Sequence, residues 1–319
     1  YNHLTETTSL TDADPRFGMQ APFTKSVTAK NIDSTGAMAI TSTTTTQRTV
    51  GTPDPTNPIA RSFVQDATVN NGRTSYSVLD QANKRTYTIS PLGRQTISYV
   101  DDLGRVTQTQ IGPLAPVDFS YDAKGRLAAS TQNGRTTSYT YNASGFLASK
   151  TNALNQSTLF LYDSVGRVTS QIFPDAREIK YSYDANGNRT SITPPGRTAH
   201  AFSFSPVDLL LDYIAPTLPS VPATTQYTYD RDQKPIQITR PDGAVITNIY
   251  KPGMSQLVEV QTPQGSTRYD YSPATAHLTA VTDRNNYVTN YTYKGSLLSR
   301  IATQGFANTR LDFTYNNDF

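Results

Sequence analysis

The feature that most constrains the fold of this chain is a repeat of about 21 residues. In most copies an aromatic residue is followed by a polar one, and these polar positions are 80, 101, 122, 142, 163, 184, 205, 230, 251, 272, 294 and 316. Ten of the eleven steps between them measure 20 to 22 residues, and the remaining step measures 25. A fixed period of this length predicts one small supersecondary unit per repeat, each stabilised by its neighbours.

The best copies share a pattern of Tyr, Asp, two variable residues, Gly, Arg and an aliphatic residue, as in the segment from Tyr121 to Leu127. Other copies keep the aromatic residue and lose part of the remainder. The positions that we assign to this structural motif are Asp101, Gly104, Arg105, Tyr121, Asp122, Gly125, Arg126, Tyr141, Gly145, Tyr162, Asp163, Gly166, Arg167, Tyr183, Asp184, Gly187, Tyr229, Asp230, Tyr271 and Tyr293.

A second turn signal lies eleven residues after the polar position of each copy. Nine of the eleven residues found there are Pro, Gly, Asn or Asp, which favour turns. Between the two turns run segments such as residues 136–141, where Tyr139 and Tyr141 alternate with smaller residues and so share one face of a strand. Each repeat is therefore predicted to be one β-hairpin, and about 24 strands are expected after Asp80.

The chemistry of the Asp-x-x-Gly-Arg turn explains its residues. An Asp side chain can accept hydrogen bonds from backbone N–H groups two or three residues further on, where the chain reverses. Glycine supplies a positive φ without steric cost. We hypothesise that the following Arg, at Arg105, Arg126 and Arg167, stacks on the tyrosine of an adjacent hairpin.

The composition supports a thin, turn-rich structure. Hydrophobic residues make up 36% of the chain, which is too little for one thick core, and only three of the 25 acidic residues are glutamates, at Glu6, Glu178 and Glu259. A net charge of +3 with mixed signs does not indicate nucleic-acid binding. The chain has no cysteine, and no apolar run reaches the roughly 20 residues that span a bilayer. We expect no cofactor, no metal and no membrane-spanning segment.

Isolated hairpins are marginally stable in water, whereas tandem hairpins that pair sideways bury a continuous face. The expected fold is all-β: one long, curved antiparallel sheet of tandem hairpins. A twisted sheet of this width should curl or close, which suggests containment.

These residues resemble the RHS repeat, also called the YD repeat, whose pattern is Tyr-Asp-x-x-Gly-Arg-Leu. The resemblance covers roughly residues 76–319. Proteins of this type include bacterial polymorphic toxins, the B and C components of insecticidal toxin complexes, and teneurins. It implies a hollow β-shell that encloses a C-terminal toxin, or a part of an adhesion ectodomain. The Asp-Pro-x-Gly type of sequence linked to self-cleavage in such shells does not occur here, since Asp14-Pro15 and Asp54-Pro55 lack the glycine.

Two regions depart from the regular period. Residues 1–75 fit it poorly and are expected to form a divergent β region, either decayed repeats (with residues 32–36 as one copy) or a separate module, whereas residues 76–319 hold about twelve repeats cut off at the end of the chain. The long step after residue 205 contains Pro216, Pro219 and Pro222. This insertion is either a loop that contacts cargo or a partner, or a tolerated extension of a hairpin tip.

Candidates for catalysis are weak. His3, His200 and His277 stand in no nucleophile or metal spacing, and the segment from Asp184 to Asn188 resembles half of a calcium loop but lies on a repeat turn. We therefore expect no enzyme. The first hypothesis is a shell segment of a secreted or surface-displayed bacterial protein, whose partners are an enclosed toxin polypeptide or further shell repeats. The alternative is a surface module that binds cell-surface carbohydrate or an adhesion receptor.

Overall fold

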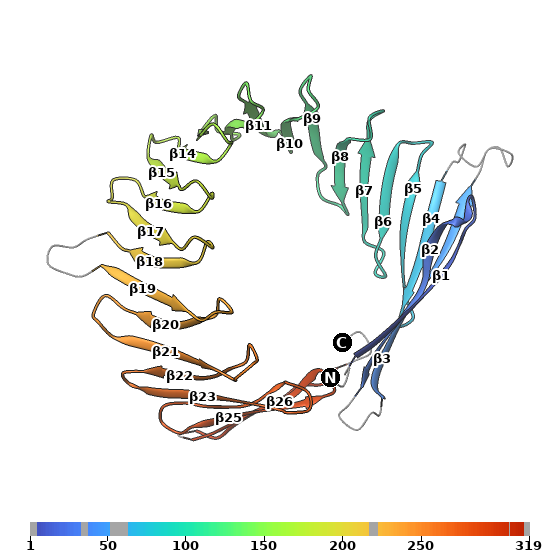
Figure 1. Ribbon diagram of the computed structural model, residues 1–319. Helices are drawn as coiled ribbons and strands as arrows, with labels where there is room; N and C mark the ends of the chain where they lie inside the picture. The colour runs from blue at the N-terminus through green and yellow to red at the C-terminus, as the bar shows by residue number, and fades with distance from the viewer. Residues whose placement is uncertain (1–4, 33–37, 52–62, 217–222, 306, 316–319) are drawn as a thin grey trace. The chain divides into compact units, whose positions relative to one another are not determined.

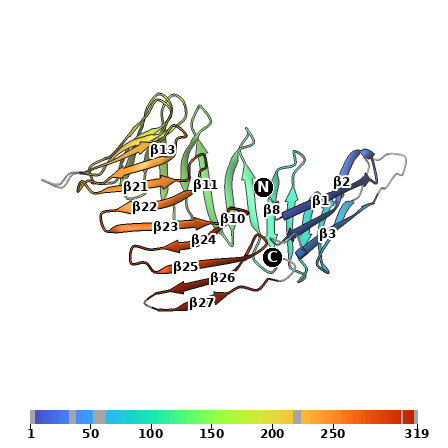
Figure 2. The same ribbon diagram turned by 60° about the horizontal axis from the view of Figure 1, so that its bottom comes forward.

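The chain folds into tandem β-hairpins. The computed structural model describes residues 5–32, 38–51, 63–216, 223–305 and 307–315, and within these ranges it contains 27 strands of one sheet and no helix (Figure 1). The predicted all-β repeat fold is confirmed. Figure 2 shows successive hairpins lying side by side in sequence order, as in the run from β21 to β24.

The strand bounds follow the repeat. They are β1 (Thr5–Asp14), β2 (Gly18–Ile32), β3 (Met38–Gly51), β4 (Phe63–Asn70), β5 (Arg73–Asp80), β6 (Arg85–Ile89), β7 (Gln95–Val100), β8 (Val106–Ile111), β9 (Val117–Tyr121), β10 (Leu127–Gln132), β11 (Arg135–Tyr141), β12 (Leu147–Thr151), β13 (Ser157–Tyr162), β14 (Val168–Ile172), β15 (Glu178–Tyr183), β16 (Arg189–Thr193), β17 (His200–Phe204), β18 (Leu210–Ile214), β19 (Thr224–Tyr229), β20 (Pro235–Thr239), β21 (Val245–Tyr250), β22 (Leu257–Thr262), β23 (Gly265–Tyr271), β24 (Leu278–Thr282), β25 (Val288–Lys294), β26 (Leu297–Gln304) and β27 (Thr309–Asp312).

The strand number differs slightly from the expectation. Strands β6 to β27 follow Asp80, so 27 − 5 = 22 strands stand where about 24 were expected. Twelve polar positions enclose eleven complete periods, and each complete period contributes two strands. The expectation counted a twelfth period that the described residues do not contain.

Neighbouring strands pair antiparallel, and a shift of register recurs at the same place in many repeats. The ladder shifts register just before the motif aromatic, as between Leu161 and Tyr162, between Ser182 and Tyr183 and between Asp270 and Tyr271. Such a β-bulge bends the strand and increases its local twist. In these three repeats the extra residue lies on the strand that follows the turn, at Thr169, Thr190 and Thr279.

The two faces of each repeat differ in chemistry. On β15 the side chains of Tyr181 and Tyr183 are half-buried, whereas Lys180 and Ser182 between them are exposed. The same alternation is present on β9, β13, β19 and β23. We call the side that carries the tyrosines and phenylalanines the aromatic face and the other side the polar face. The predicted placement of alternating aromatics on one face is confirmed.

Contacts divide the chain into two compact units. The first comprises Tyr1–Ser138, Thr292–Ser299 and Asp312–Phe319, and the second comprises Tyr139–Tyr291 and Arg300–Leu311. In the first unit, β1 to β5 are 8 to 15 residues long, whereas most later strands have five to seven. The greater strand length sets the N-terminal region apart from the short hairpins.

Candidate functional site

The Asp-x-x-Gly-Arg turns have one repeated geometry. At Asp101, carboxylate oxygen Oδ1 accepts hydrogen bonds from the backbone N–H groups of Leu103 and Arg105, both at 2.9 Å, and Oδ2 accepts from Arg105 Nε at 2.7 Å. Asp122 and Asp163 bind the residues of their own turns in the same way. The amide partners lie two and four residues on, a correction to the expected two or three, because a backbone bond already closes the third position.

An ion pair that was not predicted from the sequence joins each of these Asp residues to the Arg of its own turn. The bridge joins Asp101 to Arg105 at 2.7 Å, and equivalent bridges form at Asp122 and Asp163. The pKa of the Asp101 carboxyl lies below its ordinary value chiefly because the Arg105 side chain donates to it. For Asp122 and Asp163 the backbone N–H of the turn arginine is the larger cause of the lowered pKa. The spacing of four residues between the Asp and the Arg was the sequence signal that could have predicted this ion pair.

The same arginines connect one repeat to the next. Arg105 Cζ lies 4.6 Å from the ring centroid of Tyr121, and Arg167 Cζ lies 4.7 Å from that of Tyr183. The stacking hypothesis is confirmed for these two arginines. Each guanidinium is held by its own Asp while it covers the tyrosine that ends the following hairpin, so turn and neighbour are fixed together.

Tyrosine hydroxyl groups form a second link between repeats. The hydroxyl of Tyr183 donates to the backbone carbonyl of Val168, the residue that begins β14 after the preceding Asp turn, at 2.9 Å. The same bond recurs at 2.7 to 3.2 Å from Tyr121, Tyr162, Tyr229, Tyr250, Tyr271 and Tyr315. Burial raises the pKa of Tyr162 above its ordinary value, which further favours the neutral hydroxyl that donates this bond. This link explains why the motif prefers Tyr to Phe.

Copies that lose part of the motif replace its contacts. Phe146 stands in the arginine position, and its ring stacks on Tyr162 with centroids 5.1 Å apart. Lys234 lies 5.4 Å from the ring centroid of Tyr250 and also pairs with Asp230. Asn188 instead bonds Asp184 of its own turn and Asp208 of the next. The residue after the motif glycine or its equivalent therefore contacts the following repeat in each case.

The other residues singled out in the sequence lie apart from the complete Asp turns. Tyr141 and Tyr293 are half-buried on β11 and β25. Pro216 follows β18, and the other two prolines of the insertion, Pro219 and Pro222, lie outside the described residues, as do residues 33–36 of the supposed decayed copy. His200 Nδ1 lies 2.8 Å from the hydroxyl of Tyr213, against which its ring stacks.

The N-terminal strands contain a different acidic and basic cluster. Asp14 is 2% exposed and accepts hydrogen bonds from Arg16 Nε at 2.8 Å and from Arg48 Nη1 at 3.0 Å. Arg48 also donates through Nε and Nη2 to Asp66, both at 2.7 Å, and lies over the ring of Phe23. The Arg16 hydrogen bond is the main reason that the pKa of Asp14 lies far below its ordinary value. No sequence signal had singled out this cluster.

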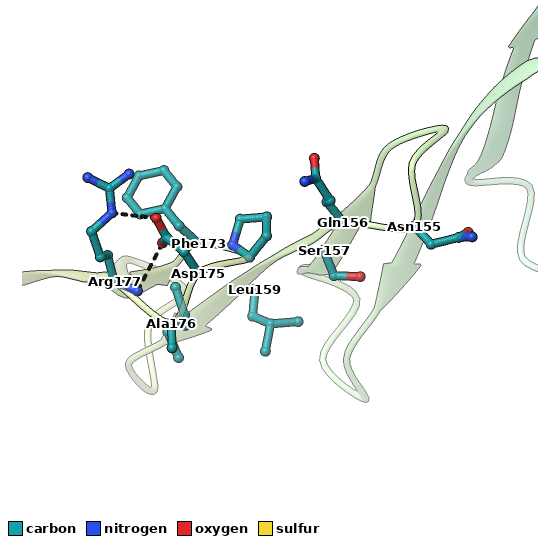
Figure 3. A pocket seen from close by; sticks show the side chains of 10 residues that line it. Asn155, Gln156, Ser157, Leu159, Phe173, Asp175, Ala176 and Arg177 are labelled. Atoms are coloured by element: carbon teal, nitrogen blue, oxygen red, sulfur yellow. Dashed lines mark hydrogen bonds and ion pairs between the residues drawn. The ribbon is translucent and has the colours of Figure 1, made fainter.

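An open hollow of about 690 Å³ lies between two turns of the second unit (Figure 3). Leu159 and Ile172, which face each other across β13 and β14, contribute its apolar lining, and Figure 3 shows Asp175 and Arg177 on one side with Gln156 on the other. Leu159 and Leu161 are 42% and 52% exposed. They form an aliphatic patch on the polar face.

Metal-ligating side chains do not gather in the described part of the chain. Among those residues, no group of three or more His, Asp or Glu side chains is placed to hold a metal ion. In the same ranges, no helix is long and apolar enough to cross a membrane. The functional features that the structure presents are the linked turns and the two faces of the sheet.

The fold and these turns define a class of protein, that of the tandem β-hairpin repeats. The family model described as Teneurin YD-shell matches residues 5–319, and the chain belongs to this family. The match extends over the N-terminal strands as well as the regular repeats.

The solved structures that align with this chain have low sequence identity and TM-scores below 0.5. The TcdB2-TccC3 crystal structure is 12% identical with a TM-score of 0.44, and the TcdB2-TccC3-Cdc42 structure is 13% identical with a TM-score of 0.45. Each alignment covers 98% of this chain and 26% of the chain in the solved structure. The Tc holotoxin pore of Photorhabdus luminescens is 12% identical with a TM-score of 0.41, and 27% of that chain is covered. The chain thus spans about a quarter of these proteins. A comparison with curated proteins found no match.

Proposed function

We propose that this chain is a wall segment of a larger shell that encloses and protects a C-terminal toxin or effector polypeptide of the same protein and helps to deliver it. The family, defined by its YD shell, supports a structural role. We further propose that the whole protein is secreted or displayed on a bacterial surface, and that no side chain of this segment performs chemistry.

The observation that carries the proposal is the exposed surface of the sheet. The accessible area is 20,301 Å², whereas a compact protein of 35.0 kDa exposes about 13,000 Å². Of the hydrophobic residues that the structure describes, only Val78 is buried. A single layer with so little core leaves both faces available to other groups, as a wall requires.

The links between repeats explain how a single layer stays rigid. A hairpin alone is marginally stable, but where the motif is complete a hairpin is joined to the previous one by a tyrosine–carbonyl bond and an Arg–Tyr stack, as at Tyr183. Both links involve the tyrosine next to an Asp turn. Stability is therefore shared along the sequence, as in other repeat proteins.

The test uses the natural protein that contains this chain, exposed to a nonspecific protease. We expect the polypeptide downstream of the wall to survive longer than the same polypeptide expressed alone. The wall variant Gly166→Ala, which places a methyl group against the ring of Phe146, should shorten that survival more than Gly104→Ala, where the added methyl group meets open space. Equal digestion of the downstream polypeptide in its free and attached forms would refute the enclosure.

The hollow favours a second candidate, a carbohydrate-binding surface. Phe173 offers a ring, Leu159 and Ile172 an apolar floor, and Gln156 and Arg177 polar groups at the rim, which is the combination that sugar rings use. A glycan array with the chain, its Phe173→Ala variant and a Phe160→Ala control on the aromatic face tests this. Binding that only Phe173→Ala abolishes would support it, and silence across diverse sugars would exclude it.

A further inference from the structure

A buried asparagine in β2 contacts a turn that lies more than 260 residues away in the sequence. Asn31 is 2% exposed. A buried amide requires hydrogen-bond partners, and Asn31 finds them in the turn between β25 and β26: its Nδ2 donates to the carbonyl of Lys294 at 2.8 Å, and its Oδ1 accepts from the Ser296 backbone N–H at 2.8 Å and from Ser296 Oγ at 2.5 Å. All of these residues belong to the first compact unit.

The turn is shaped to receive this side chain. Gly295 has a φ of +63°, and a Cβ at this position would lie 2.6 Å from both amide heteroatoms of Asn31. Glycine is required here both by its backbone conformation and by the close approach of Asn31. Beside this contact, Thr5 Oγ1 lies 3.4 Å from Ser296 Oγ, so a second side chain of the N-terminal hairpin meets the same turn.

We infer that Asn31 is a latch that holds the turn Lys294–Ser296 against the N-terminal strands and can open without unfolding either side. The groups that it joins are an amide, a hydroxyl and backbone atoms, all of which water can satisfy after separation. Opening therefore separates polar groups, whereas separating β1 from β2 would break a ladder of nine paired positions. This inference does not depend on the proposed enclosure of cargo.

Hydrogen exchange followed by mass spectrometry on the whole chain tests the latch. Asn31→Ala should accelerate exchange of the Ser296 amide and the start of β26 at least tenfold, while β13 to β16 keep their wild-type rates. Lys30→Ala is the matched control, because Lys30 neighbours Asn31 on β2 and forms only an exposed ion pair with Glu6. Unchanged exchange at Ser296, or acceleration spread equally over all strands, would overturn the latch.

The partner side provides an independent variant. Gly295→Ala should accelerate exchange in β1 and β2, because its methyl group displaces the Asn31 amide that joins these strands to the turn. Gly253→Ala is its control. Gly253 has a φ of +71°, so an alanine there would bear a similar backbone strain, but its Cβ would meet nothing within 4 Å. If both glycine variants leave exchange in β1 and β2 at the wild-type rate, the turn does not dock there.

A disulfide trap decides the matter even if Asn31→Ala fails to fold. The chain has no cysteine, and the 3.4 Å between the Thr5 and Ser296 hydroxyl oxygens suits a disulfide after Thr5→Cys and Ser296→Cys. Mild oxidation should give one intramolecular crosslink in most molecules. The pair Thr8→Cys and Ser296→Cys, displaced by about 10 Å along β1, should give at least tenfold less. Equal or absent crosslinking in the two pairs would overturn the latch.

Discussion

The repeat turns and the N-terminal strands use the same chemical pair, aspartate with arginine, in opposite ways. In the turns, Arg105 and Arg126 bind an Asp four residues earlier, and the carboxylates remain about a quarter exposed. In the N-terminal region, Asp14 is 1% exposed in its side chain and is bound by Arg48, 34 residues away on β3. One pair is local, partly hydrated and repeated, whereas the other is distant and buried.

This difference decides what each pair contributes. A partly exposed pair is screened by water and mainly fixes the shape of the turn and the position of the arginine over the next tyrosine. A buried carboxylate that loses its partners remains in a poorly hydrated site, which is strongly unfavourable, as is the loss of one partner from a buried pair. The repeats should therefore tolerate loss of a single turn pair, and the N-terminal strands should not tolerate loss of Asp14.

The largest effect is expected from Asp14→Ala. The change leaves the Arg16 and Arg48 guanidinium groups without their shared carboxylate, which should cost about 3–5 kcal/mol of local opening free energy in β1 and β3. Hydrogen exchange measures this region by region. Asp101→Ala serves as the comparison and should open only its own turn. Equal effects of the two variants would remove the distinction between buried and exposed pairs.

The next effect contrasts two repeat glycines. Gly166 and Gly104 have φ values of +89° and +77°, but a Cβ at Gly166 would clash with the Phe146 ring, whereas one at Gly104 meets open space. Gly104→Ala should cost about 1 kcal/mol for the backbone alone. Gly166→Ala should cost about 3 kcal/mol because the Phe146–Tyr162 stack must also move. Opening free energies of β13 and β14, from hydrogen exchange, check this, and matching costs at both sites would contradict it.

A smaller effect concerns the tyrosine hydroxyl. Tyr183→Phe should lose about 1 kcal/mol of opening free energy at β15, because the carbonyl of Val168 loses its donor. Phe204 occupies the equivalent position one repeat later and has no hydroxyl. Phe204→Tyr should therefore gain a similar amount at β17. A gain from both variants, or a loss from both, would show that hydration rather than the carbonyl bond governs this position.

The turn residues could be predicted from sequence because their contacts are local. The period placed the hairpins, and the glycine and aspartate of each turn act within four residues, as at Asp122 and Gly125. The Arg–Tyr stack was accessible as well, because it joins residues one strand apart. The link between Tyr183 and Val168 was not, since it depends on which strand face and which carbonyl the bulge presents.

The N-terminal contacts could not be predicted because they join residues that no period relates. Asp14 and Arg48 belong to β1 and β3, and Asn31 meets a turn near the other end of the sequence. A buried asparagine has no signature that separates it from an exposed one. Charge alone also did not distinguish Asp14 from the many aspartates on turns, since only burial makes it different.

The smallest effect is the response to mild acid. Asp14 and Asp101 both have lowered folded-state pKa values, chiefly through hydrogen bonds from Arg16 and Arg105, and the pKa of Asp14 is lowered further. A carboxyl with a depressed folded pKa contributes stability above the unfolded pKa of about 3.9, and this is lost as pH falls towards the folded value. From pH 7 to 5 neither region should change, and between pH 4 and 3 the loss at Asp14 should be about 1 kcal/mol.

Because the Asp14 pKa is the lower, the slope of stability against pH should persist to lower pH in β1 than in the turn after β7. Hydrogen exchange corrected for its intrinsic pH dependence measures both, and a slope that ends at the same pH in the two regions would show that burial does not separate these aspartates.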